Sequence, residues 1–402
     1  MRLLTFIHLT FGIICLTFFV KVYLDNAAST PVDSRVSEAM APFVNNFYGN
    51  PSSIHSFGKQ LKVVLEEARE IASAFIGCKP KEIFFTSGGT EANNSAIKGL
   101  TFACFDNLSS KNHIITNSIE HPAVTDTVNY MQKFGFEITV IKPEKNGRVD
   151  PELIKKALKP STLLVTMMHA NNELGTINDI EKTGEICREN GVWFHSDTVQ
   201  SIGKTELNVK NAGLHFATCS AHKIYGPKGT GFLYVSEETK IDKYIHGGGQ
   251  ERNMRGGTEN IAGIAGLMTA ILILKNEMSA DIRNYKSINK YLSGKLLEVY
   301  GSNVIFNSPA DRCLDNILNI SFNHEKLNVA EGMLPLQLDI KGVSVSGGSA
   351  CASGSLKPSS VLLETGINTK TALSSIRVSS GRHTTKDEID YFIKSVSEIV
   401  TK

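Results

Sequence analysis

One lysine, Lys223, stands where its ammonium group should be hard to keep charged. The apolar run LHFATCSA at 214–221 leads into it, and the turn-forming sequence GPKG follows at 226–229. Burial in apolar surroundings lowers the pKa of a lysine, and a neutral amine can form a Schiff base with an aldehyde. Lys223 is therefore a candidate for covalent attachment of an aldehyde cofactor. The alternative is a surface lysine beside a turn.

A second segment, FFTSGGTEANN at 84–94, is typical of a strand, a tight turn and the start of a helix. Backbone N–H groups of such a turn, here around Gly89 and Thr90, converge on an anion at the positive end of the helix, and the Thr90 hydroxyl adds a donor. The segment predicts a phosphate site. The alternative is an ordinary helix start with Thr90 as its N-cap.

Asp197 ends a third strand, in HSDTVQ, and Gln200 follows within one turn. Ligands of open α/β sheets sit at the carboxyl ends of parallel strands. An aspartate there can keep a pyridine nitrogen protonated, so that the ring accepts electrons, although a helix-capping role is the alternative. Together with a reactive lysine and a phosphate turn, Asp197 predicts a site for pyridoxal 5'-phosphate.

Three further polar residues follow or lie on predicted strands. His121, in NSIEHPAV, could stack on the cofactor ring and move protons. Asn172, in HANNELG, could donate to a ring oxygen or to the substrate. Arg377, in SSIRVSSGR, has the planar fork that suits a substrate carboxylate. Structural roles, and for Arg377 a surface salt bridge, are the alternatives.

Cys351 lies in SVSGGSACASGS at 344–355, which is rich in serine and glycine. Glycine and small side chains give little to pack, so we expect Cys351 on a mobile loop from which its thiol can reach a substrate. The alternative is a small buried cysteine. The glycine-rich segment at 246–260 offers Thr258 as an anion contact to a neighbouring subunit.

The bulk composition is that of an ordinary soluble protein of 402 residues, which is long enough for two domains. With 42 basic and 40 acidic residues, the net charge of +2 gives no argument for direct nucleic-acid binding. The 7 cysteines are scattered, with no Cys-x-x-Cys pair. This pattern favours a reducing, cytoplasmic location and excludes a disulfide framework, and we predict no resident metal site.

The apolar N-terminal stretch at 3–20 is close to the shortest length that spans a membrane. Three interpretations stay open. The stretch is an upstream extension from a misassigned start, a signal anchor or membrane-associating segment, or a helix packed on the protein.

Strands and helices alternate from about residue 82, which predicts an α/β fold with a mostly parallel sheet. Expected strands lie at 82–87, 113–117, 137–142, 162–169, 192–197, 216–221 and 231–236, with helices at 90–100, 122–134, 151–158, 180–190 and 260–278. From about 280 we expect a smaller α+β unit with a long helix, strands near 316–322 and 343–347, and a final helix from 386.

These segments together resemble the pyridoxal-phosphate-dependent cysteine desulfurases of the NifS/IscS type, within the fold-type I, class V aminotransferase group. The resemblance runs from about residue 22 to the C-terminus. It rests on YLDNAAST (23–30), YGNPSSIH (48–55), TSGGTEANN (86–94), EHPAV (120–124), NNELG (171–175), SDTVQSIGK (196–204), SAHKIYGPKG (220–229), GGGQERNMRGGTEN (247–260) and SGGSACASGSLKPS (346–359).

The resemblance implies a large cofactor-binding domain at 36–279 with a seven-stranded sheet. The segment at 22–35 would pack with a small domain at 280–402, and 1–21 would be an extension. It also implies a role for each site residue. Lys223 would be the Schiff-base lysine, Asp197 the ring-nitrogen partner, His121 the stacking residue, Gln200 the phenolic-oxygen contact, Thr90, Ser220 and His222 phosphate ligands with Thr258 of the other subunit of a homodimer, Asn172 and Arg377 substrate-orienting residues, and Cys351 the nucleophile.

The implied reaction converts L-cysteine to L-alanine. Lys223 takes the α-proton, and Cys351 takes the sulfur as a persulfide. The sulfur would pass to an iron–sulfur scaffold or a thiolation relay protein, with Cys351 ligating a cluster only transiently. The chain stops at DYFIKSVSEIVTK, without the tail that IscS-like members use for scaffold docking, which puts that partner in question.

Two other functions stay open. One is another class V reaction, such as that of a selenocysteine lyase or an aminotransferase, in which Cys351 is dispensable. The other is a catalytically silent sulfur-relay or assembly subunit that retains the fold.

Overall fold

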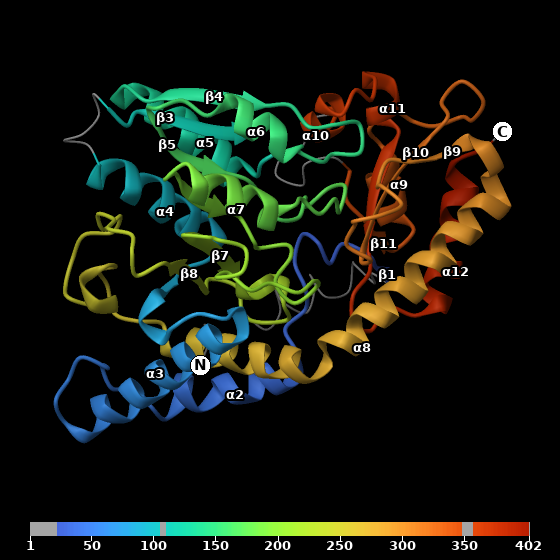
Figure 1. The fold of residues 1–402 in the computed structure, drawn as a ribbon. Helices are drawn as coiled ribbons and strands as arrows, with labels where there is room; N and C mark the ends of the chain where they lie inside the picture. Colours follow the sequence, from blue (N-terminus) through green and yellow to red (C-terminus); the bar gives the residue numbers. More distant parts are fainter. Residues whose placement is uncertain (1–21, 105–109, 348–356, 402) are drawn as a thin grey trace, which may run out of the picture.

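The computed structural model describes residues 22–104, 110–347 and 357–401, and within them the largest sheet has seven strands (Figure 1). Their order is β2-β8-β7-β6-β5-β3-β4, and β8 alone runs antiparallel to both its neighbours. The strands are β2 (Ile83–Thr86), β3 (His113–Asn117), β4 (Glu137–Ile141), β5 (Thr162–Thr166), β6 (Trp193–Ser196), β7 (Phe216–Ser220) and β8 (Gly231–Val235). The expected α/β fold with a mostly parallel sheet is confirmed.

Helices cover both faces of this sheet, because neighbouring residues of a strand point to opposite faces. Ile114 and Leu164 pack with α4 (Gly89–Ala103) and α5 (Pro122–Met131) on one face. Ile115 and Val165 belong to the core on the other face. That second face is covered by α3 (Ser56–Ile76), α6 (Pro151–Ala157), α7 (Ile180–Glu189) and the first part of α8 (Ile261–Tyr300).

A second core gathers the C-terminal elements. Here β12 (Ser375–Ser379), β10 (Ile317–Phe322) and β9 (Val304–Phe306) form an antiparallel sheet, and β1 (Val22–Tyr23) pairs in parallel with β11 (Val343–Ser344). The helices of this part are α9 (Leu334–Ile340), α10 (Ser360–Glu364), α11 (Thr369–Leu373) and α12 (Lys386–Ile399).

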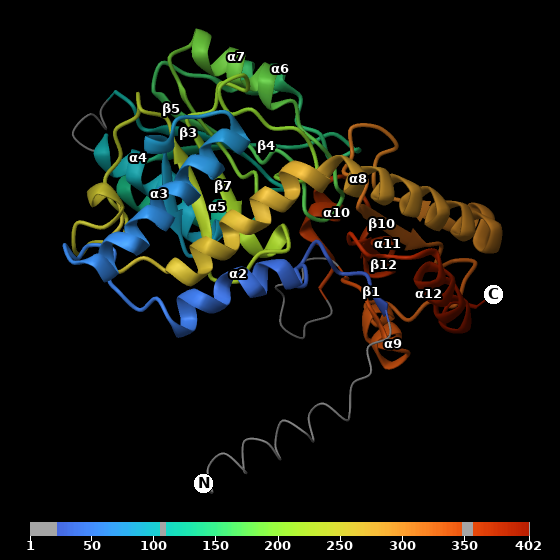
Figure 2. The ribbon, with the colours of Figure 1, turned by 90° about the horizontal axis from the view of Figure 1, so that it is seen from below.

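Helix α8 joins the two cores without a break. Figures 1 and 2 show it running from beneath the seven-stranded sheet to the C-terminal elements, with α2 (Ser34–Asn45) alongside. Its Leu274 packs in the first core and its Ile288 in the second. The sequence suggested one helix ending near residue 278 and another after it, and this was wrong. No glycine or proline interrupts the sequence there, so the helix continues while its apolar stripe passes from one core to the other. A division at 279/280 stays a prediction.

The helix Ile261–Asn303, which includes α8, is also the one candidate membrane span that the described residues contain by length and composition. Of its most apolar window, 56% is buried inside the protein. That burial identifies it as a core helix.

The segment after β1 crosses from the second core to the large sheet. Asp25 forms a bridge with Ser379, whereas the Thr30 N–H and hydroxyl both donate to the carbonyl of His222. Residues 26–30 therefore lie between the two cores, next to Lys223.

Candidate active site

The carboxyl end of β7 places Lys223 in a short 3₁₀ turn, η4 (Ala221–Lys223). Its Nζ donates to the carbonyl oxygens of Ala27 and Ala28, at 2.6 and 2.8 Å. The side chain is half-buried. The amine thus sits at the edge where β6 and β7 end, between the sheet and the N-terminal segment.

Gln200 lies beside this lysine and shares an acceptor with it. Its Nε2 donates to the Ala27 oxygen at 2.9 Å, and its Oε1 accepts from Lys204 Nζ at 3.4 Å. Lys204 was not among the residues singled out from the sequence. Burial and the neighbouring Lys223 lower the pKa of Lys204 to about 7. A second amine, which is charged only in part near pH 7, therefore lies close to the candidate Schiff-base lysine.

Asp197 follows β6 directly, with 6% of the residue exposed. Its Oδ2 accepts from Asn93 Nδ2 at 2.7 Å, and its Oδ1 accepts from the Val199 backbone N–H at 3.0 Å. The second bond is the local one expected of a capping aspartate. The first reaches across to α4 and holds the carboxylate at the strand end.

The turn before α4 has the features of an anion cradle. The helix begins at Gly89 and its N-cap is Gly88, which has no side chain to cap the first-turn N–H groups. The alternative in which Thr90 is the N-cap is therefore wrong. A Cβ added at Gly89 would lie 2.7 Å from Val199 Cγ2, and one added at Gly88, whose φ is +143°, would lie 3.4 Å from Ser220 Oγ. The turn thus packs against Ser220 and leaves room for backbone only.

His222 lies in a cationic surrounding at the same place. Its Nδ1 lies 3.2 Å from Ser29 Oγ. Burial and the nearby charges of Lys223, Lys228 and Lys204 lower its pKa to about 4. The same positive field favours a bound phosphate.

His121 is the N-cap of α5 and follows β3. Its Nδ1 accepts from the Ala123 backbone N–H at 3.1 Å, so in the neutral ring the proton is on Nε2. The cap fixes the ring at the carboxyl edge of the sheet, as a stacking residue would require.

Glu120, next to His121, is a buried carboxyl group that the sequence did not single out. Its Oε1 accepts from Asn117 Nδ2 and from the Met168 backbone N–H, both at 2.5 Å, while its Oε2 has no partner within the described residues. Burial and the charge of Asp197 raise its pKa to about 8. Near neutral pH this group is therefore mostly protonated.

The raised pKa predicts a loss of stability with rising pH. The unfolded chain ionises Glu120 near pH 4.5, but the folded chain only near 8, so its contribution is complete below 4.5 and falls as the pH rises to 8. The loss is at most about 5 kcal/mol. Glu120→Gln keeps an oxygen for both donors and cannot ionise. We expect the melting temperature of Glu120→Gln, relative to that of the wild type, to increase as the pH is raised from 5 to 8. A constant difference, like that of the exposed control Glu181→Gln, would contradict the prediction.

Arg377 comes from β12 of the second core and is 2% exposed, so it is not a surface arginine. Its Nη1 donates to the Asn172 carbonyl and its Nη2 to Asp25 Oδ1, both at 2.8 Å. The Nε atom is buried without a partner in the described part of the chain. The guanidinium thus contacts the backbone of Asn172 and the side chain of Asp25, which the sequence did not single out.

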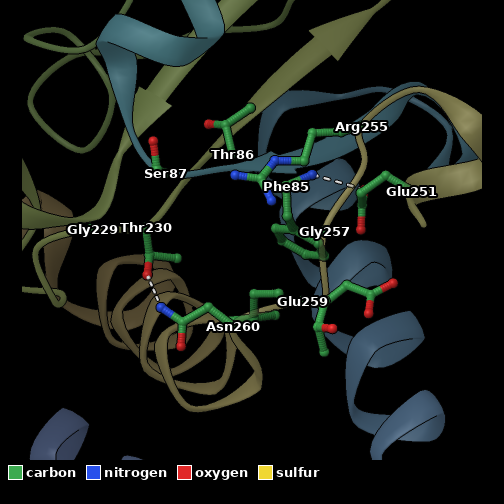
Figure 3. Close-up of a pocket in the computed structure, with 12 residues that line it drawn as sticks. Phe85, Thr86, Ser87, Gly229, Thr230, Glu251, Arg255, Gly257, Glu259 and Asn260 are labelled. Carbon is green, nitrogen blue, oxygen red and sulfur yellow. Dashed lines mark hydrogen bonds between the residues drawn. The ribbon is translucent and has the colours of Figure 1, made fainter. Parts of the chain in front are cut away.

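Thr258 lies apart from this group. It is exposed and lines a pocket of about 170 Å³ with Thr86, Ser87, Thr230 and Asn260 (Figure 3). Arg255 in the same pocket pairs through two nitrogens with Glu91 at 2.9 and 3.1 Å. The residues that line this pocket include neither Lys223 nor Asp197, although Thr86 and Ser87 directly precede the turn at Gly88 and Gly89.

Cys351 lies outside the described residues. The structure does describe five cysteines, and burial raises the pKa of every one of them. The pKa reaches about 12 for Cys78, Cys187 and Cys313. These five thiols are poor nucleophiles near neutral pH, because the thiolate is the reactive form.

The residues present fit pyridoxal phosphate in chemistry and order. One edge of the sheet carries a lysine amine for the aldehyde of the cofactor and a carboxylate for its ring nitrogen. The same edge carries an amide for its phenolic oxygen and an uncapped helix start for its phosphate. Gly88 and Gly89 leave the turn open, because a Cβ at Gly89 would collide with Val199 and one at Gly88 would crowd Ser220.

Comparison with known proteins agrees with this arrangement. The family model described as aminotransferase class-V matches residues 22–392. A cysteine desulfurase IscS of Dictyoglomus turgidum is 45% identical over 383 residues, covering 95% of each chain, and one of Haemophilus influenzae is 43% identical over 388 residues, covering 95% of this chain and 93% of its own.

Solved structures show the same relationship. A protein described as NifS-like superimposes with a TM-score of 0.86 at 35% identity, covering 94% of this chain and 98% of its own. The structure described as SspA in complex with cysteine has a TM-score of 0.79 at 34% identity, covering 91% and 100%. The chain therefore belongs to the class V aminotransferase family and, within it, to the cysteine desulfurases of the IscS/NifS type.

Proposed function

We propose that this chain is a pyridoxal-phosphate-dependent cysteine desulfurase that converts L-cysteine to L-alanine and keeps the sulfur as a persulfide on Cys351. The observation that carries the proposal is the meeting of Lys223, Gln200, Asp197 and the uncapped start of α4 at one edge of the sheet.

Pyridoxal phosphate, when bound, supplies an electron-accepting ring. Lys223 would hold it covalently, Asp197 its ring nitrogen, Gln200 its phenolic oxygen, and Gly89, Thr90, Ser220 and His222 its phosphate. His121 would stack on the ring. Lys223 then moves the α-proton of cysteine, since its amine is already held at this edge by two carbonyl oxygens.

The substrate carboxylate would bind at Arg377, beside Asn172. The buried guanidinium has an Nε–H without a partner among the described residues, and its position is set by Asp25 and by the Asn172 carbonyl. A carboxylate there forms charge-assisted hydrogen bonds. The side chain of Asn172 orients the rest of the amino acid.

Sulfur transfer requires a thiolate, and Cys351 in its serine- and glycine-rich segment is the candidate, since burial raises the pKa of each of the five cysteines that the structure describes. Its sulfur forms a bond to the substrate sulfur, the carbon–sulfur bond of the substrate breaks, and the carbon skeleton leaves as alanine after protonation. Both flanks of this segment are attached near the substrate residues. Ser346 Oγ donates to Asp25 Oδ1 at 2.8 Å, and Ser359 Oγ donates to Glu173 Oε2 at 2.5 Å.

A homodimer would complete the site. Thr258 is exposed in one chain, so it is available to the cofactor phosphate of a partner subunit. Large apolar side chains in the α2–α3 region, Val44, Tyr48 and Ile54, are 68%, 78% and 89% exposed, which supports a covered surface there.

The acceptor of the sulfur would be an iron–sulfur scaffold or a thiolation relay protein, and the place of action the cytoplasm. Membrane association through residues 3–20 concerns a segment outside the described residues.

The test is a product analysis of the purified holoenzyme with L-cysteine. We expect alanine, and in the absence of a reductant a mass gain of one sulfur atom that maps to the peptide with Cys351. Alanine without any protein persulfide, with the sulfur released as elemental sulfur or, once a thiol reductant is added, as sulfide, would favour a lyase. Transfer of the amino group to a 2-oxo acid would favour an aminotransferase, and no turnover with bound cofactor a silent subunit.

A further inference from the structure

A row of buried polar side chains continues from Asp197 across the sheet. Thr166 on β5 and His195 on β6 are paired residues of neighbouring strands. Thr166 Oγ1 lies 2.7 Å from His195 Nδ1, and His195 Nε2 lies 3.0 Å from Asn93 Oδ1. The Asn93 amide then donates to Asp197 Oδ2 at 2.7 Å. Thr166, His195 and Asn93 are each at most 1% exposed.

The chemistry of these groups fixes the direction of each bond. An ionised carboxylate only accepts, so the NH₂ group of Asn93 faces Asp197 and its oxygen faces His195. His195 must then donate from Nε2. Burial lowers the pKa of His195 to about 4 against the opposing effect of Asp197, so the ring is neutral. Its one proton is therefore on Nε2, and Nδ1 accepts the Thr166 hydroxyl hydrogen.

We propose that Asn93 and His195 are positioning residues that hold the Asp197 carboxylate in the orientation that a protonated ring nitrogen of the cofactor requires. This inference rests on the proposed function, since the ring nitrogen belongs to pyridoxal phosphate. Asp197 has one donor from its own backbone turn, at Val199, which fixes Oδ1. The row through Asn93 fixes Oδ2, so the plane of the carboxylate is set from both sides.

A second buried histidine in the same sheet supplies a control for a purely structural role. His113 on β3 is fully buried, and its two ring nitrogens lie 2.8 Å from Thr162 Oγ1 and Thr139 Oγ1. Its hydrogen bonds end on those threonines and do not reach Asp197. A phenylalanine at either position removes two hydrogen bonds from the sheet, but only at 195 does it leave Asn93 Oδ1 without its donor.

The experiment compares wild type, His195→Phe, His195→Gln and His113→Phe as holoenzymes. The readouts are the dissociation constant for pyridoxal phosphate, the pH midpoint of the visible absorption of the bound cofactor, and the melting temperature. We expect His195→Phe to weaken binding about tenfold, the size of one hydrogen bond to a charged group. We expect the pH midpoint of His195→Phe to move to higher pH. A poorly held Asp197 stabilises the protonated ring nitrogen of the cofactor less, and without that positive charge the nitrogen that joins the cofactor to Lys223 is protonated more easily.

His195→Gln keeps an amide donor toward Asn93 and should restore most of both properties. His113→Phe should lower the melting temperature without moving either one. The inference is overturned if the two phenylalanine variants bind cofactor equally and share the wild-type midpoint. Wild type that shows no visible absorption with added cofactor would instead refute the proposed function.

Asn93→Ala provides the test if His195→Phe does not fold. It removes the amide that donates to Asp197 Oδ2 and leaves the Val199 bond to Oδ1 in place. The midpoint should then rise in the same direction, with binding weakened at least about tenfold for the loss of one hydrogen bond to a charged group. An unchanged midpoint in Asn93→Ala would equally overturn the inference.

Discussion

Lys223→Ala should abolish covalent attachment of pyridoxal phosphate and lower the rate of alanine formation from L-cysteine at least about a thousandfold. The amine is the one positioned at the carboxyl edge, held by the carbonyl oxygens of Ala27 and Ala28. Lys204 is next to it, but it is turned to Gln200, so it should not substitute. The measurements are intact mass after borohydride reduction and alanine production.

The matched control is Lys182→Ala, which removes an exposed lysine paired with Glu185 on α7. It should retain the cofactor mass and the wild-type rate. If Lys223→Ala still carries cofactor after borohydride reduction, another amine forms the attachment. Lys204 would then be the residue to replace next.

Cys351→Ser should lower alanine formation at least about a hundredfold and prevent persulfide formation, while cofactor absorption stays unchanged. A hydroxyl cannot accept sulfur from cysteine in this step, and the buried thiols at Cys78, Cys187 and Cys313, whose pKa values burial raises to about 12, cannot take its place. Mass spectrometry of the protein and the rate of alanine release check both parts.

Cys15→Ser and Cys78→Ser are the controls for this prediction, and both should behave like wild type. If Cys351→Ser released alanine and, with a thiol reductant present, sulfide at the wild-type rate, the sulfur-transfer step proposed for Cys351 would be refuted. The carbon–sulfur cleavage at the Lys223 site would remain, and the enzyme would act as a lyase.

The strands of the large sheet could be predicted because each is a short, mostly apolar run with glycine or polar turn residues beside it, and this holds even for β4, which is only partly buried. Helices α2 and α3 were missed, although Asp33 caps the first and Gly77, at φ +75°, ends the second. Apolar residues such as Val44 and Val63 are 68% and 66% exposed there. Their presence on the outer side blurs the helical period from which an amphipathic helix is recognised.

The candidate site could be predicted where a residue's type and its place after a strand both indicated chemistry, as for Lys223 and Asp197. The residues that support them were missed, because their role depends on contacts between distant segments. Asp25 reaches Arg377 only through the fold. His195 did carry a signal, since it lies on β6 two residues before Asp197, which directly follows that strand.

Because α8 contributes Leu274 to one core and Ile288 to the other, the two cores should unfold together. Between them Asp281 accepts from Arg382 Nε and Nη2, so the junction is itself bonded to the C-terminal part. A fragment that ended near residue 279 would cut this helix in two and expose apolar side chains. Because most helical stability comes from packing, the cut end of the helix would lose its stability as well. The chain should accordingly behave as one cooperative unit that cannot be divided into separately expressed halves.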